Sequence, residues 1–296
     1  MRIVSLVPHA TELLFALGLG DQVVGVTHEC DYPEEATELQ PVTRNVLADG
    51  LSPSAIDQAV RERTQRGESI YELDDEIMGE LEPDLIVTQA LCHVCAVSVD
   101  EVQALAQTLP GPPRVISLDP KTYGETLGDV RTIAQATGSK DAALDLIART
   151  ARRADVVRLA VRDAPRPRVV ALEWLDPVFV AGHWTPQLIE RAGGEDVLGF
   201  AGEPSREATW DEVAAAQPEI VVVMPCGYDA SRALVEAEEF AGRLRSVGAD
   251  QVVAVNASAY FSRPGPRLID GLELLAHILH PDRVPSAAAE ALAVEL

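Results

Sequence analysis

Basic side chains and long apolar runs are both scarce in this sequence. Lys and Arg together number 24 against 47 Asp and Glu, so the formal net charge is -23 over 296 residues. Nucleic-acid binding needs a basic face, and an anionic membrane surface attracts basic clusters, so both partners are disfavoured. No apolar run approaches the roughly 20 residues of a membrane-spanning helix. The composition therefore predicts a solvated, acidic surface and no membrane insertion.

The N-terminal residues lack a convincing export signal. Met1-Arg2 followed by Ile3 to Val7 resembles the start of a signal peptide, but Pro8, His9 and Glu12 interrupt the apolar run. No small-residue cleavage site follows it. We predict that residues 2–6 form the first core strand and that the protein is cytoplasmic. The alternative is an exported protein from which a leader has been removed.

Cysteine is scarce as well, with four residues in the chain, which excludes a disulfide scaffold. Cys30 follows the apolar run 23–26, Cys92 and Cys95 follow 85–87, and Cys226 follows 220–223. Ligands of open α/β sheets bind beyond the carboxyl ends of the strands. We therefore expect these cysteines to meet in one cleft. If the protein is exported, Cys92 and Cys95 can pair instead.

Short apolar runs alternate with helical patterns along the whole chain, which predicts an α/β fold with mainly parallel sheets. Residues 141–162 form the longest helical stretch and end at Pro165-Arg166-Pro167. We interpret them as a helix that joins two domains, an N-terminal lobe at 1–138 and a C-terminal lobe at 165–296, with the linking helix at 139–164. The alternative is a surface helix of one larger domain.

A weak internal repeat supports two lobes. Residues 76–87 and 211–222 both begin with an acid, are broken by a proline and continue into an apolar strand. A cysteine follows each proline by eight or nine residues. Two similar lobes with a cleft between them follow from this pattern.

The opening segment 3–12, Glu82-Pro83-Asp84-Leu85-Ile86, Gln217-Pro218-Glu219-Ile220-Val221 and the closing segment 263–273 resemble one protein family. It is the substrate-binding proteins of ABC importers for metal chelates, in the two-lobed branch with a helical backbone. The likeness is strongest to the cobalamin-binding members. It implies a ligand cleft between the lobes, binding without turnover, and, for an exported protein, an ABC transporter permease as partner. Haem and siderophores are the alternative ligands.

The resemblance also implies ligand contacts from aromatic and polar side chains, which stand out because only 4% of the residues are aromatic. A corrin has a broad apolar face rimmed with amides, which suits flat aromatic walls with a few donors. Ordinary core packing is the alternative for each aromatic residue, and an ion pair with Asp270 or Glu273 is the alternative for Arg263. The predicted ligand-binding residues are His9, Tyr32, Trp174, Phe179, His183, Trp184, Tyr228, Tyr260, Phe261 and Arg263.

Family members dock on their transporter through one acidic residue in each lobe. Glu76 and Asp211 occupy matching places in the two halves and are the residues that the resemblance implies for docking. The alternative is that each is an acid favoured by the dipole at the start of a helix.

The cysteines also allow a second hypothesis, an intracellular metal- or cluster-binding protein or enzyme. Cys92-x-x-Cys95 can hold one metal ion with two thiolates. Cys30 and Cys226 would complete the set, with His28 and His93 as alternative ligands. Such a set suits Zn²⁺ or an iron–sulfur cluster, and it can also place a thiolate or imidazole against a corrinoid cobalt. The alternative is four free thiols. No nucleophile lies beside a general base, which favours binding over catalysis.

Overall fold

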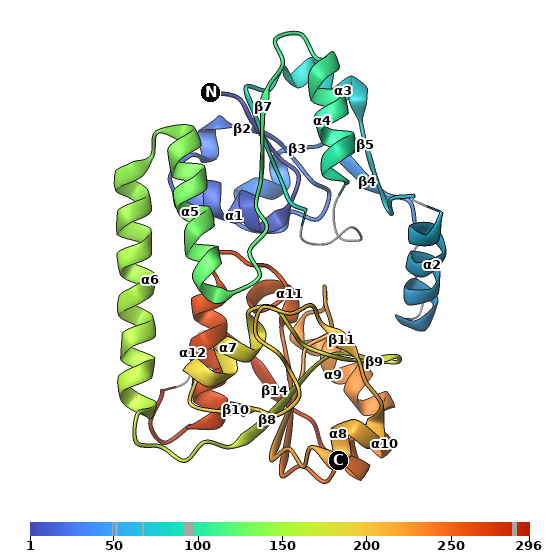
Figure 1. Cartoon of the computed structure of the whole chain (residues 1–296), viewed down its shortest axis with the longest axis vertical. Helices are drawn as coiled ribbons and strands as arrows, with labels where there is room; N and C mark the ends of the chain where they lie inside the picture. The colour runs from blue at the N-terminus through green and yellow to red at the C-terminus, as the bar shows by residue number, and fades with distance from the viewer. Residues whose placement is uncertain (49, 51–52, 67, 91–96, 286–288) are drawn as a thin grey trace. The chain divides into compact units, whose positions relative to one another are not determined.

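The computed structural model describes residues 1–296 apart from 49, 51–52, 67, 91–96 and 286–288. The chain divides into two units (Figure 1). Unit 1 contains Met1–Pro120 and Leu127–Leu146, and unit 2 contains Lys121–Thr126 and Ile147–Leu296. In the described parts of the chain, no helix is both long and apolar enough to cross a membrane.

Unit 1 is built on a five-stranded, fully parallel sheet with the order β3-β2-β1-β6-β7. The central strands are fully buried runs of mainly branched apolar residues, as is typical of a sheet covered on both faces. Met78 and Val102 pack with Val4 and Ile86 in one core cluster, so α3 and α4 cover one face. Figure 1 shows α1 and α5 on the other side. The strands are β1 (Ile3–Ser5), β2 (Val23–Val26), β3 (Gln40–Pro41), β6 (Leu85–Thr88) and β7 (Arg114–Ser117), and the helices are α1 (Pro8–Ala16), α3 (Asp75–Leu81), α4 (Val99–Thr108) and α5 (Tyr123–Thr137).

A second, two-stranded ribbon interrupts unit 1 between β3 and α3. It pairs β4 (Thr43–Asn45) with β5 (Tyr71–Leu73) in antiparallel fashion, and the connection between them carries α2 (Pro53–Gln65). Figure 1 shows α2 projecting away from the parallel sheet of its own unit. The ribbon brings Thr43 and Tyr71 close to the residues that follow β2.

Unit 2 is built on a seven-stranded sheet whose parallel centre is β8-β12-β13. The antiparallel strands β9, β11 and β14 extend it, and β10 pairs with β8 in parallel. Val213, Ala233 and Leu244 pack in one core cluster with Val221, so α8, α9 and α10 cover one face. The strands are β8 (Arg168–Leu175), β9 (Val178–Val180), β10 (Glu195–Asp196), β11 (Arg206–Glu207), β12 (Ile220–Val223), β13 (Gln251–Val255) and β14 (Ala291–Ala293), and the helices are α7 (Thr185–Arg191), α8 (Trp210–Ala215), α9 (Ala230–Glu239), α10 (Ala241–Val247), α11 (Ala257–Tyr260) and α12 (Leu268–Leu279).

The long helix α6 (Lys140–Val161) has 22 residues and agrees with the helix predicted at 141–162. Its residues up to Leu146 belong to unit 1, and those from Ile147 belong to unit 2. Within unit 2, Arg153 donates to Glu273 Oε1 at 2.8 Å and to Asp270 Oδ1 at 2.6 Å. The two acids of α12 that the sequence suggested as partners for Arg263 therefore hold an arginine of α6, which fastens these two helices together.

The internal repeat has a backbone counterpart. Helix α3 is followed by Glu82, with φ 40°, immediately before Pro83, and α8 is followed by Gln217, with φ 48°, immediately before Pro218. A left-handed residue followed by proline is a common helix stop. The next strands are β6 and β12, which pair with the first strand of their respective sheets, β1 and β8. The repeat thus encodes the same helix–strand step in both units.

Candidate functional site

An aromatic group lies at the carboxyl edge of the unit 2 sheet, where ligands of parallel sheets bind. Trp174, near the end of β8, meets Tyr228 edge to face, with ring centroids 5.8 Å apart and an interplanar angle of 74°. Phe179 of β9 is the cross-strand partner of Trp174. Trp174 and Phe179 are half-buried, whereas Tyr228 is buried. Trp174, Phe179 and Tyr228, here called the aromatic edge group, thus come together from two separate segments.

The loop that carries Tyr228 is held by backbone hydrogen bonds on both sides. Its N–H donates to the Pro225 carbonyl at 3.0 Å, and its carbonyl accepts from the Ser258 N–H at 3.0 Å. The first bond closes the turn after β12, and the second ties this turn to α11, which follows β13. The segments that follow β12 and β13 are therefore tied together at this edge of the sheet.

Charged groups of α9 support this edge. The Arg232 guanidinium lies over the Tyr228 ring at 3.7 Å from its centroid, a cation–π contact. One turn further along α9, burial raises the pKa of the Glu236 carboxyl, and Arg232 opposes this effect. Burial also raises the pKa of the Tyr228 hydroxyl. The Arg232 guanidinium thereby covers one face of the Tyr228 ring. The Trp174 ring therefore offers more free surface than the Tyr228 ring does.

Trp184 and Phe261 form a separate, enclosed pair in unit 2. The Trp184 indole N–H donates to the Phe261 carbonyl at 2.7 Å, and the two side chains are only 5% and 2% exposed. Trp184 precedes α7 directly and Phe261 follows α11 directly. This bond joins two elements of the same unit and leaves little of either ring free to meet a ligand.

His183 sits in a strained turn beside that pair. It has φ 52°, and its N–H donates to the Glu203 carbonyl at 2.6 Å. Desolvation by burial lowers the pKa of its imidazole, and the charge of Lys121 lowers it further. His183 therefore presents a half-buried imidazole that is neutral at pH 7.

The remaining predicted ligand contacts differ widely in exposure. Tyr32 is 47% exposed, whereas His9, on the first turn of α1, is 2% exposed. Tyr260, in α11, is half-buried, with the Arg267 guanidinium 5.9 Å from its ring centroid. Arg263 is half-buried, in the segment between α11 and α12. The ligand-binding roles of these four residues remain predictions.

In unit 1, a hydroxyl network surrounds the residues that follow β1 and β2. The Thr11 hydroxyl of α1 donates to Ser5 Oγ at 2.8 Å and lies 3.1 Å from Cys30 Sγ. The Cys30 side chain is 8% exposed. Its thiol is therefore occupied by a hydroxyl of its own unit and packs like a small, weakly polar core residue.

A second network in unit 1 fixes His28. The Thr43 hydroxyl accepts from the His28 N–H at 3.1 Å, lies 2.7 Å from His28 Nδ1 and donates to Thr27 Oγ1 at 2.8 Å. Tyr71 packs edge-on against the imidazole, with centroids 4.9 Å apart, and its hydroxyl donates to Glu29 Oε1 at 2.5 Å. The imidazole is thus held from two sides by the β4–β5 ribbon.

Only some of the predicted metal-binding residues lie in the part of the chain that the structure describes. Cys92, His93 and Cys95 lie outside the described residues. Among the residues that are described, no three His, Cys, Asp or Glu side chains gather closely enough to hold a metal ion. Cys30 is buried and Cys226 is exposed. The described members, Cys30, Cys226 and His28, do not form a metal centre by themselves.

Comparison with known proteins decides the family. The sequence profile described as "Periplasmic binding protein" matches residues 3–259. The chain belongs to this family. A vitamin B12-binding protein of Vibrio cholerae serotype O1 is 24% identical over 288 residues, which cover 92% of this chain and 86% of the relative.

Solved structures of the family share its fold. The periplasmic vitamin B12-binding protein of Vibrio cholerae superposes with a TM-score of 0.66 at 23% identity, covering 95% of this chain and 96% of that one. The periplasmic heme-binding protein of Roseiflexus sp. RS-1 superposes with the same TM-score at 26% identity, covering 96% and 98%. These matches confirm the two-lobed α/β fold predicted from the sequence. They favour the exported alternative over the predicted cytoplasmic location, because the family is named for periplasmic members.

The two acids that the sequence predicts for docking are both on the surface of this chain. Glu76 lies in the first turn of α3, Asp211 lies in the first turn of α8, and both side chains are exposed. The helix starts differ in their caps, because Asp74 caps α3 alone whereas Thr209 and Glu212 form a capping box at α8. The repeat thus places an exposed acid at the same step of each unit, and its role in docking remains a prediction.

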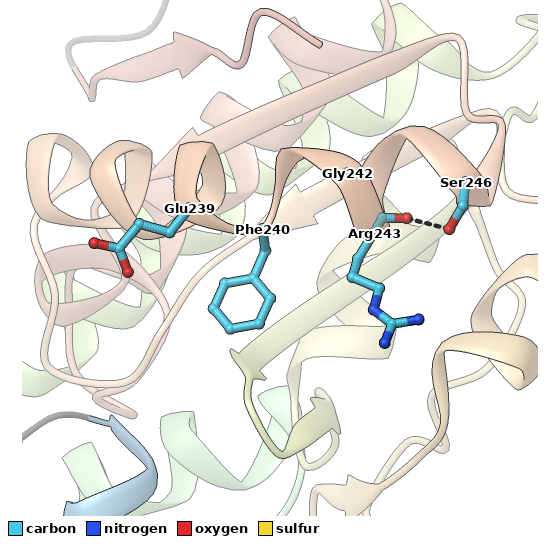
Figure 2. Close-up of a pocket in the computed structure, with 5 residues that line it drawn as sticks. All are labelled: Glu239, Phe240, Gly242, Arg243 and Ser246. Carbon is cyan, nitrogen blue, oxygen red and sulfur yellow. Dashed lines mark hydrogen bonds between the residues drawn. The ribbon is translucent and has the colours of Figure 1, made fainter.

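A surface hollow in unit 2 lies away from the aromatic edge group. Glu239, Phe240, Gly242, Arg243 and Ser246 line it where α9 meets α10 (Figure 2). Helix α10 leads into the amino end of β13, the opposite end from the ligand edge. Phe240 stacks on Trp210, with ring centroids 6.4 Å apart. The hollow is therefore part of the helical covering layer of unit 2.

Sequence reasoning missed the residues that hold the candidate contacts in place. Arg232 belongs to α9, which the periodicity did not indicate, and Thr43 and Tyr71 belong to the β4–β5 ribbon, which was also not foreseen. Tyr71 meets Glu29 across a separation of 42 residues. No local pattern reports such a pairing, because it depends on where the ribbon returns to the sheet.

Proposed function

We propose that this protein binds a metal tetrapyrrole, cobalamin or haem, releases it chemically unchanged and delivers it to an ABC transporter permease. The family contains binding proteins rather than enzymes, and a binding role fits both units. The observation that carries the ligand class is the similarity to curated vitamin B12-binding proteins over 92% of the chain.

The aromatic edge group supplies a chemical reason for this ligand class. A tetrapyrrole is a broad, flat ring system, and a half-buried indole is well suited to stack on it. Trp174 and Phe179 are cross-strand partners, so they occupy the same face of the β8–β9 hairpin. We infer that this face contacts the ring of the ligand, with Tyr228 as its support.

Haem is the second candidate, and a specific comparison favours it. The heme-binding protein of Roseiflexus sp. RS-1 is 26% identical to this chain over nearly all of both proteins. Cobalamin and haem share the feature that the aromatic edge group recognises, a planar macrocycle around one metal. They differ in the groups on the rim, amides for a corrin and carboxylates for haem.

Isothermal titration of the purified full chain with cyanocobalamin, haemin and a ferric siderophore tests the proposal. We expect one equivalent of a tetrapyrrole to bind, and mass spectrometry of the recovered ligand to show it unchanged. Binding of the siderophore alone would contradict the tetrapyrrole assignment while leaving the family role intact. Chemical conversion of the bound ligand would contradict binding without turnover.

A further inference from the structure

The hydrogen bonds around Thr43 determine which nitrogen of His28 carries the proton. A threonine hydroxyl has one proton to donate and two lone pairs to accept with. Thr43 donates its proton to Thr27 Oγ1 and accepts from the backbone N–H of His28. The contact of 2.7 Å to His28 Nδ1 can therefore only be a bond in which Nδ1–H donates. The neutral imidazole must then carry its free lone pair on Nε2.

That lone pair is available for coordination. The His28 side chain is exposed, and its ring contact with the Thr43 hydroxyl is made through Nδ1. Metal-ligating imidazoles typically donate their other N–H to a fixed oxygen, which sets the tautomer and the ring orientation. Thr43 and Tyr71 give His28 this arrangement.

A single open imidazole is best suited to a small molecule whose metal already has most of its donor atoms. A free ion needs several protein ligands, whereas a metal already held by a macrocycle needs only one. A siderophore that saturates all six positions of its iron leaves none for a side chain. A tetrapyrrole fills four positions in a plane, and in haemin or aquocobalamin an axial position can still accept a side chain, as in proteins where histidine holds haem iron.

We propose that His28 Nε2 is an axial ligand to the metal of the bound tetrapyrrole. This inference rests on the proposed function and narrows it to ligands with an exchangeable axial position. In the binding step, axial water leaves with its own electron pair and the Nε2 lone pair forms the new bond. The oxidation state of the metal does not change, and Thr43 acts as a positioning residue.

The experiment uses two pairs of ligands, and in each pair one member can accept an axial side chain whereas the other cannot. Haemin and aquocobalamin have an exchangeable axial position, whereas metal-free protoporphyrin IX has no metal and cyanocobalamin holds a tight cyanide. Each ligand is titrated into the full chain and into His28→Ala, and both affinity and absorbance spectrum are recorded.

We expect the wild-type protein to give an imidazole-bound spectrum with haemin or aquocobalamin. His28→Ala loses this spectrum, and added free imidazole restores it. Protoporphyrin IX or cyanocobalamin should bind the two proteins equally. Thr43→Val removes the oxygen that accepts from His28 Nδ1–H. It should weaken the binding of haemin or aquocobalamin by about 10-fold, which is the lower end of the usual effect of removing a residue that orients a metal ligand. Thr43→Ser, which keeps the hydroxyl, should restore the affinity.

The outcomes separate this inference from the proposed function. If both proteins bind haemin or aquocobalamin with the same affinity and spectrum, His28 is not an axial ligand although the binding function stands. If the wild-type protein binds none of the four ligands, the proposed function and the axial ligand are both overturned.

Discussion

Arg2 and Arg168 make the same contacts in the two units. Each donates its backbone N–H to an acid after the proline of the repeat, Arg2 to Asp84 at 2.7 Å and Arg168 to Glu219 at 2.8 Å. Each guanidinium also donates to the carbonyl two residues before that proline, at Leu81 and Ala216. An arginine at the start of the first strand thus caps the end of the helix that precedes the neighbouring strand in both sheets.

Removing one of these caps should destabilise its own unit. Arg168→Ala leaves the carbonyls of Ala216 and Gln217 without their charged donor, and we expect a loss of about 1–2 kcal/mol in the free energy of unfolding. Urea unfolding followed by circular dichroism measures it. Arg158→Ala is the matched control, because its pair with Asp155 is exposed and contributes about 0–1 kcal/mol. Equal losses for the two variants would contradict the capping role.

Trp174 should contribute more to ligand affinity than any tryptophan remote from the edge. Trp174→Ala removes a half-buried indole of the aromatic edge group and should weaken tetrapyrrole binding by about 1–3 kcal/mol. Titration calorimetry with the tightest tetrapyrrole measures the change. Trp210→Ala serves as the control, since Trp210 stacks on Phe240 in the covering helices. An unchanged affinity for Trp174→Ala would remove this residue from the site.

The stability of unit 2 should depend on pH through Glu236. Burial raises the pKa of this carboxyl above its ordinary 4.5 in the folded protein. The folded state therefore holds the proton more tightly, so the carboxyl destabilises it progressively as the pH rises from about 4.5 through the raised pKa. Glu236→Gln should raise the melting temperature more at pH 8 than at pH 4. A gain that is the same at both pH values would show that ionisation of Glu236 carries no cost.

Docking through the two exposed acids predicts a change in transport without a change in ligand affinity. Asp211→Lys or Glu76→Lys should lower transporter-stimulated ATP hydrolysis several-fold in a reconstituted system, because reversing an interface charge mainly slows association. Glu238→Lys, an exposed acid on α9, is the control for net charge. Equal effects of all three substitutions would show that overall charge, rather than a specific contact, controls docking.

Local sequence patterns predicted the elements whose signals lie within a few residues. The helix predicted at 141–162 differs from α6 by one residue at each end, and Pro8 lies at the start of α1, because proline fits the first turn of a helix. The antiparallel strand β14 was not foreseen, since its pairing depends on β13 being already in place. Helices α5 and α9 were not predicted either.

The sequence by itself determined the fold class, the two-unit repeat and the family, because each follows from periodicity and from short segments that recur along the chain. The tertiary structure decided which of the candidate side chains lie together and which are buried. Cys30, expected to join other cysteines, lies against Thr11, while Trp174 and Tyr228 meet at one edge. Parallel strands bring distant loops together at their carboxyl ends, but packing around each loop settles which atoms are engaged, as it does for His28 Nδ1.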